Sequence, residues 1–193
     1  MIKRLGDQKH LEINVTSDAI AHPSQASTAG NPALSAALAI TLIAAATLAG
    51  AWFFQLALGL VPCPLCLEQR YAYYLAVPLG VLVAIAAAKN APRPVLLAGL
   101  AILALAALGN AVLGFYHAGV EWKIFQGPTD CTGPVGNLGS AGNLLARLDT
   151  VKVIRCDEVQ WTFLGLSLAG YNVLISLLMA AIGVWGLVRT SKR

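Results

Sequence analysis

The residues best suited to chemistry are two cysteines and an arginine in the stretch Pro62-Cys63-Pro64-Leu65-Cys66-Leu67-Glu68-Gln69-Arg70. A Cys-x-x-Cys pair can close a small disulfide ring, and one of its thiols often has a lowered pKa and is therefore reactive. If the following helix begins near Cys66, its N-terminal dipole favours a thiolate there, and Arg70 lies one turn further along the same face. The stretch therefore predicts thiol–disulfide chemistry, with Cys66 as the thiolate.

Other interpretations of the same residues remain open at this point. The pair could form a structural disulfide or half of a zinc site, and Arg70 could simply anchor the end of a helix. With Cys131 and Cys156 the chain has four cysteines, and zinc accepts four sulfurs in a tetrahedron. The second pair lies in a glycine-rich stretch without the spacing of a zinc knuckle, and an even cysteine count fits an oxidising compartment. We therefore expect disulfides and no bound metal.

The composition identifies the elements that must position these residues. Of the 193 residues, 58% are hydrophobic and 11% are charged, whereas soluble domains average about 25% charged residues. Four runs without charged residues are each long enough to cross a bilayer, which takes about 20 residues. The predicted spans cover residues about 33–60, 67–88, 95–117 and 162–188. The sequence thus predicts an all-α membrane protein, a four-transmembrane-helix bundle.

The segments outside the spans have distinct characters. Residues 1–32 are polar and predict a disordered tail, which ends in Asn31 and Pro32 as a helix N-cap and first helical residue. The membrane domain then covers residues 33–188, with loops at 61–66 and 118–161, and residues 189–193 form a second short tail. In the long loop Leu144, Leu148 and Val151 recur at helical spacing. They predict a short horizontal amphipathic helix on the membrane surface.

The distribution of lysine and arginine predicts the orientation. The side with more basic residues is expected to be cytoplasmic. That side carries Lys3, Arg4, Lys9, Lys89, Arg93, Arg189, Lys192 and Arg193, against Arg70, Lys123, Arg147, Lys152 and Arg155 on the other. Both termini are thus expected in the cytoplasm and all four cysteines on the opposite side. No basic run with interleaved aromatic residues occurs, so we expect no nucleic-acid partner.

Aromatic residues and one histidine lie near the predicted redox residues. Tyr71, Tyr73 and Tyr74 could form an aromatic belt at the membrane interface, or they could line a site for a flat ring. Both interpretations are kept. His117 is the only histidine near a span, and we interpret it as a hydrogen-bonded structural residue.

Together these motifs resemble the DsbB family. The resemblance rests on Cys63-Pro64-Leu65-Cys66 and Arg70 after the first of four spans, and on Cys131 and Cys156 in the second outer loop. It also rests on the stretch Asp157-Glu158-Val159-Gln160-Trp161-Thr162-Phe163-Leu164-Gly165. The resemblance covers residues from about 34 to 188.

The resemblance implies a quinone-dependent thiol:disulfide oxidoreductase of the bacterial inner membrane. Such a protein reoxidises a periplasmic DsbA-like partner with a thioredoxin fold and passes the electrons to ubiquinone or menaquinone in the lipid. By the match, Cys131 takes the partner's thiolate, Cys156 relays to Cys63, and Cys66 meets the quinone beside Arg70. The alternative is a structural or transport bundle whose disulfides brace the loops. The thiols of such a bundle would not respond to quinone.

Overall fold

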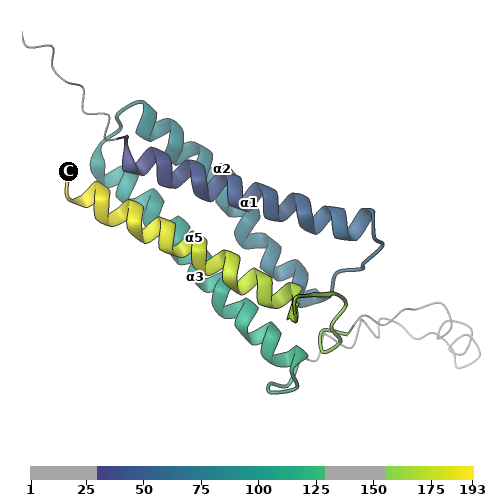
Figure 1. Ribbon diagram of the computed structural model, residues 1–193. Coiled ribbons are helices and arrows are strands. Elements are labelled where there is room, and N and C mark those ends of the chain that lie inside the picture. The colour runs from purple at the N-terminus through teal and green to yellow at the C-terminus, as the bar shows by residue number, and fades with distance from the viewer. Residues whose placement is uncertain (1–29, 129–154) are drawn as a thin grey trace, which may run out of the picture.

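Four long helices pack side by side as a bundle in the computed structural model, which describes residues 30–128 and 155–193 (Figure 1). They are α1 (Pro32–Leu56), α2 (Pro64–Ala88), α3 (Arg93–Glu121) and α5 (Leu168–Ser191). Each is long and apolar enough to cross a membrane. The predicted four-helix membrane bundle is therefore confirmed. Most of the polar N-terminal tail, the predicted amphipathic helix and Cys131 lie outside the described residues.

The two ends of the bundle carry different parts of the chain (Figure 1). At one end the Asn31 side-chain amide donates to the carbonyl of Ala87 (2.9 Å), and Arg193 donates to the carbonyl of Gly30 (3.2 Å). These contacts bring the start of α1, the end of α2 and the C-terminus together. The start of α2, the end of α3 and the start of α5 lie at the opposite end, together with Cys63 and Cys156. The described cysteines therefore share one end of the bundle.

Local capping explains where the first two helices begin. The Asn31 side chain accepts hydrogen bonds from the backbone N–H groups of Ala33 (3.1 Å) and Leu34 (3.4 Å), and Pro32 is the first helical residue. This confirms the predicted start of α1. Helix α2 begins at Pro64 with Cys63 as its N-cap, whereas the sequence predicted a start near Cys66. The earlier start follows because Pro64 has no backbone N–H group that would need a partner.

The prediction of a helix from residue 162 is wrong, because a small hairpin comes first. Strands β1 (Thr162–Phe163) and β2 (Leu166–Ser167) pair antiparallel, with Thr162 opposite Ser167 and Phe163 opposite Leu166. Leu164 and Gly165 between them both have positive φ values, 49° and 79°. Two such residues are typical of a tight two-residue hairpin turn. Ser167 then caps α5 by accepting from the N–H of Gly170 (3.2 Å).

The other helix ends also differ from the predicted bounds. Helix α1 stops at Leu56 and the chain turns through Gly59, whose φ is 65°. Helix α3 continues to Glu121, beyond the predicted end at residue 117. That extra turn brings Glu121 above His117 on the same face of the helix.

Small residues at the contacts hold the helices close together. A side-chain carbon added at Gly183 would lie 2.9 Å from the Ala104 Cβ, and one added at Gly186 would lie 2.6 Å from the Ala36 Cβ. Ile40, Leu100 and Met179 belong to the core of the bundle and are almost fully buried. Close approach of this kind is the usual way in which helices associate in lipid, where van der Waals packing replaces the hydrophobic effect.

We predict that Gly183→Ala destabilises the bundle although alanine is the better helix former. The added methyl group meets Ala104, including its backbone, and overpacking of this kind costs about 1–3 kcal/mol. Gly109→Ala in α3 is the matched control, since nothing lies within 4 Å of the added carbon. Thermal unfolding in detergent should give a lower Tm for Gly183→Ala and an unchanged or higher Tm for Gly109→Ala. Equal Tm values for the two variants would contradict the described packing of α3 against α5.

Candidate redox site

The Cys-x-x-Cys pair lies at the first turn of α2. The sulfur of Cys63, the N-cap, accepts a hydrogen bond from the backbone N–H of Cys66 (3.2 Å). The two sulfurs are themselves hydrogen-bonded, 2.7 Å apart, and both cysteines are free. Cys63 is 2% exposed, whereas Cys66 is only partly buried. The pair is therefore close enough to form a disulfide, and its two sulfurs lie in different surroundings.

Cys156 packs against this pair from a distant part of the chain. It is disulfide-bonded and only 1% exposed. With Cys63, Leu65 and Val120 it forms a small buried cluster at this end of the bundle, which we call the cysteine cluster. Cys66 packs against the edge of the cluster. The fold thus brings together three of the four predicted redox cysteines, and Cys131 lies outside the described residues.

His117 joins the site from α3, which the sequence analysis did not predict. Its Nε2 atom lies 3.6 Å from the Cys63 sulfur and 4.0 Å from a carboxylate oxygen of Glu121. Its Nδ1 atom pairs with the side-chain amide of Gln69 (2.8 Å). His117 and Gln69 are both buried, and the hydroxyl of Ser167 donates to Glu121. Helical spacing offered a partial signal, because Gln69 lies one turn after Cys66 and Glu121 one turn after His117.

These contacts favour the thiolate on Cys63. The hydrogen bond from the Cys66 thiol, together with that from His117, lowers the pKa of Cys63 to about 5 against the opposing effect of burial. The sequence predicts the thiolate on Cys66 only if α2 begins there, and α2 begins at Pro64. The N-cap position instead gives Cys63 the hydrogen bond from the N-terminal backbone, which favours a negative charge.

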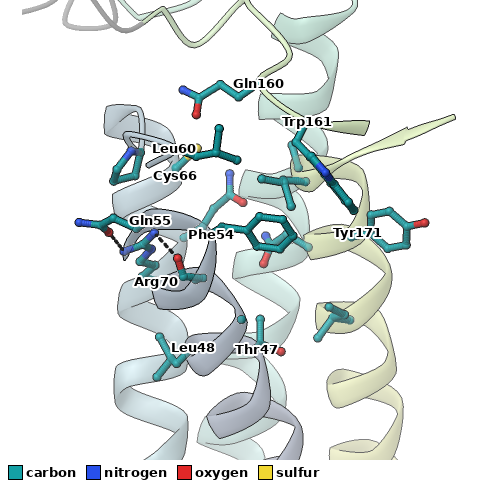
Figure 2. A pocket seen from close by; sticks show the side chains of 18 of the residues that line it. Thr47, Leu48, Phe54, Gln55, Leu60, Cys66, Arg70, Gln160, Trp161 and Tyr171 are labelled. Carbon is teal, nitrogen blue, oxygen red and sulfur yellow. Dashed lines mark hydrogen bonds between the residues drawn. The ribbon is translucent and has the colours of Figure 1, made fainter. Parts of the chain in front are cut away.

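A cavity of about 380 Å³ lies next to the pair (Figure 2). Cys66 and Arg70 of α2 line it, together with Phe54 and Gln55 of α1 and Trp161 of the segment before β1. Figure 2 shows the Phe54 and Trp161 rings on one side of the cavity and Arg70 on another. The cavity therefore combines aromatic walls with a thiol and a cation.

The segment 155–161 covers this end of the bundle, and we call it the strap. The Trp161 ring lies 4.9 Å from the Phe54 ring, centroid to centroid, and the Gln160 amide donates to the carbonyl of Val61 (2.9 Å). Asp157, next to Cys156, accepts hydrogen bonds from Arg155 and Lys123, which hold the pKa of its carboxyl below the usual range. The strap is thus fixed to both α1 and the end of α3.

The two interpretations of the tyrosines apply to different residues. Tyr73 is 3% exposed, lines the cavity and donates to the side-chain carbonyl of Asn172 (2.5 Å). Tyr71 and Tyr74 are 70% and 43% exposed on the outside of the bundle. Tyr73 is therefore part of the site, whereas the other two are placed as residues of an aromatic belt would be.

Arg70 is held by uncharged groups. It donates to the side-chain carbonyl of Gln55 (2.7 Å) and to the backbone carbonyl of Ala51 (3.3 Å), as the dashed lines in Figure 2 mark. Its guanidinium carbon lies 5.6 Å from the centre of the Trp52 ring. Gln55 was not predicted as a site residue, because its contact with Arg70 joins two helices and leaves no local pattern in the sequence.

Comparison with known proteins identifies the family. The family model described as "Disulfide bond formation protein DsbB" matches residues 33–186. The chain belongs to the DsbB family. "Disulfide bond formation protein B" of Methylococcus capsulatus is 36% identical over 146 residues, which cover 72% of this chain and 85% of that protein. The protein of the same name from Xylella fastidiosa (strain 9a5c) is 32% identical, and the match covers 71% of this chain and 79% of that protein. The one from Azoarcus sp. is 31% identical, and the match covers 77% of this chain and 88% of that protein.

Membership of the DsbB family connects the paired cysteines with disulfide bond formation in a membrane protein. The protein is a multi-pass membrane protein of disulfide bond formation, and the family name implies a disulfide oxidoreductase. In this DsbB-family protein the sulfur of Cys63 belongs to the cysteine cluster with Cys156, while Cys66 also lines the cavity. The Cys-x-x-Cys pair therefore lies between a second cysteine and a site able to hold a small molecule.

We predict that the reactivity of Cys63 depends on its two side-chain hydrogen-bond donors, Cys66 and His117. In the reduced protein, alkylation of Cys63 should be nearly independent of pH above about 6 and should fall as the pH drops through about 5, because the thiolate is then protonated. Cys66→Ala should raise the pKa of Cys63 and move this fall to higher pH. His117→Ala should do so by a smaller amount, because the bond from Cys66 has the larger effect. Rates of iodoacetamide alkylation, followed by mass spectrometry, measure both shifts; a profile unchanged in both variants would contradict the described contacts.

Proposed function

We propose that this protein reoxidises a DsbA-like dithiol oxidase and passes the electrons to a membrane quinone. One observation carries the proposal: Cys66 packs against the cysteine cluster on one side and lines the cavity with Arg70 on the other. Electrons that arrive at Cys63 from Cys156 can thus leave through Cys66. The relatives are named for disulfide bond formation, which supports the thiol half of this reaction.

The residues around the cavity suit a quinone head group. Phe54 and Trp161 provide aromatic faces for a flat ring. Arg70 is a hydrogen-bond donor next to Cys66 and could stabilise negative charge on a quinone oxygen. When bound, a quinone would supply an acceptor for two electrons and two protons.

The energetics also favour an acceptor of this kind. DsbA is a strong oxidant with a potential of about −120 mV, about 100 mV above a glutathione pool. Transfer of two electrons from reduced DsbA to glutathione disulfide would therefore be unfavourable by about 5 kcal/mol. A quinone is a stronger oxidant and reaches the bundle through the lipid. Ubiquinone and menaquinone both meet this requirement.

We assign the thiol steps as follows. The partner's thiolate attacks Cys131, which frees Cys156, and the Cys156 thiolate attacks Cys63 in its disulfide with Cys66. The Cys63–Cys66 bond breaks and Cys66 leaves as a thiolate beside the cavity. The partner's second thiol then attacks the partner sulfur bound to Cys131, which forms the partner's disulfide and frees Cys131. The Cys131 thiolate attacks Cys156, re-forms the Cys131–Cys156 disulfide and releases Cys63. The reduced Cys63–Cys66 pair then gives two electrons and two protons to the quinone and closes its disulfide again.

The proposal also gives His117 a role and the bundle an orientation. His117 next to the Cys63 sulfur can hold a proton or donate a hydrogen bond at that atom. The proposal places the cysteine end of the bundle in the periplasm and both chain termini in the cytoplasm, in agreement with the excess of lysine and arginine at the other end.

A direct assay tests this function. Purified protein is mixed with a reduced DsbA-like partner and ubiquinone or menaquinone, and quinone absorbance and partner thiols are followed together. We expect one quinone reduced for each partner disulfide formed, and no reduction by Cys66→Ala. Quinone loss without formation of partner disulfide, or unchanged activity of Cys66→Ala, would overturn the proposal.

We predict that Cys156→Ser accumulates a mixed disulfide with the partner, whereas Cys131→Ser accumulates none. Cys131 is the proposed point of attack, and Cys156 is the thiol that can otherwise attack Cys131 and displace the partner from the mixed disulfide. Non-reducing gels followed by peptide mapping identify the linked cysteines. A partner linked to Cys63 or Cys66 instead would contradict this assignment.

We predict that Arg70→Met lowers kcat with quinone on the order of a hundredfold, as expected for loss of one donor to developing negative charge. Arg70→Lys should keep part of the activity, because lysine retains the charge but not the planar fork. Steady-state kinetics on folded protein, with equal amounts verified by absorbance, measure both variants. If kcat and KM were unchanged in both, Arg70 would only anchor the end of α2.

A further inference from the structure

The contacts of Arg70 suggest a role for its neighbour Gln55, which is not itself redox-active. Both hydrogen-bond acceptors of Arg70 are neutral carbonyl groups, from Gln55 and Ala51, and its third contact is the face of Trp52. Among the described residues, 30–128 and 155–193, no carboxylate forms an ion pair with Arg70. Arg70 and Gln55 are both partly buried on the cavity wall. A cation in such a place usually has an acidic partner, because burying an unpaired charge is costly.

The neutral contacts stabilise the cation without cancelling its charge. A carbonyl group and an aromatic face are attracted to a cation through a dipole and a quadrupole, which carry no net charge. Ala51 and Gln55 also lie in the last turns of α1, where the helix dipole is negative and favours a nearby cation. A carboxylate at the same place would bind the guanidinium through two hydrogen bonds and neutralise it. The full positive charge therefore remains available to the cavity.

We propose that Gln55 is a positioning residue that orients Arg70 toward the cavity and keeps it an uncompensated cation. The proposal rests on the proposed quinone reduction, since it concerns how the same site treats a ligand that becomes negative. The hydrogen bond from Arg70 to the Gln55 carbonyl uses one of the five N–H donors of the guanidinium. The bond to Ala51 uses a second, so further donors remain for a thiolate or a quinone oxygen.

The experiment compares two substitutions of nearly equal size. Gln55→Glu adds a charge and strengthens the bond to Arg70, while Gln55→Met keeps the volume and removes the bond. We expect Gln55→Glu to lower kcat/KM for quinone about tenfold, because it replaces neutral contacts by an ion pair. We expect Gln55→Met to lower it about threefold, because Arg70 is then less well oriented but keeps its charge. Gln126→Glu, in the exposed segment after α3 and not among the residues that line the cavity, is the control for an added negative charge.

A second measurement does not require quinone turnover. In a Cys63→Ser background, the rate at which iodoacetamide alkylates Cys66 reports how strongly Arg70 favours the thiolate. We expect a slower rate with Gln55→Glu than with Gln55→Met, and no change with Gln126→Glu.

The order of the two variants decides between the proposal and a bracing role. If Gln55 only braces Arg70, Gln55→Glu should retain activity and Gln55→Met should lose it, and this order would overturn the proposal. Two variants equal to the wild type in both measurements would overturn it as well. If the wild-type protein itself fails to reduce quinone with partner electrons, the proposed function falls first, and the assignment of Gln55 with it.

Discussion

The start of α2 is the constraint on which the site depends. A helix N-terminus inside a bundle must find acceptors for backbone N–H groups that have no partner within the helix. Here a sulfur, that of Cys63, provides one of them, and Pro64 removes the need for another. The same contact that begins the helix therefore favours negative charge on the reactive atom. Movement of this helix start would change both the fold at this end of the bundle and the chemistry of the thiols.

The other polar groups of the site, His117 and Glu121, are buried in largely apolar surroundings and have polar partners. His117 is buried against α2 and is neighboured by Glu121, whose carboxylate accepts from the hydroxyl that caps α5. Three helices thus meet through polar contacts at the cysteine end. Further along the bundle, the side chains of Tyr73, Asn110, Asn172 and Ser176 hydrogen-bond across α2, α3 and α5, and most of the other contacts are made by alanine, glycine and aliphatic residues. The polar side chains inside the bundle thus contact the sulfurs or one another.

Features that depend on local chemistry could be predicted from the sequence, and features that depend on distant contacts could not. Asn31 and Pro32 predicted the start of α1, and the charge-free runs predicted the four spans. The pairing of Gln55 with Arg70 and of His117 with Cys63 joins separate helices, so no spacing in the chain reveals it. The hairpin before α5 was missed because Leu164 adopts a positive φ, which leucine rarely does. The apolar run through Phe163 and Leu166 therefore suggested a continuous helix.

The strap links two sites through a single short segment. Cys156 lies against the cysteine cluster, and only a few residues later Trp161 lies against Phe54 at the cavity. A shift of Cys156 away from Cys63 pulls on Gln160 and Trp161, whose contacts with Val61 and Phe54 close the same end of the bundle. Under the proposed function, thiol exchange at Cys156 and quinone binding next to Trp161 would then be mechanically coupled. Such coupling would favour alternating half-reactions, in which one of the two proposed substrates leaves before the other binds.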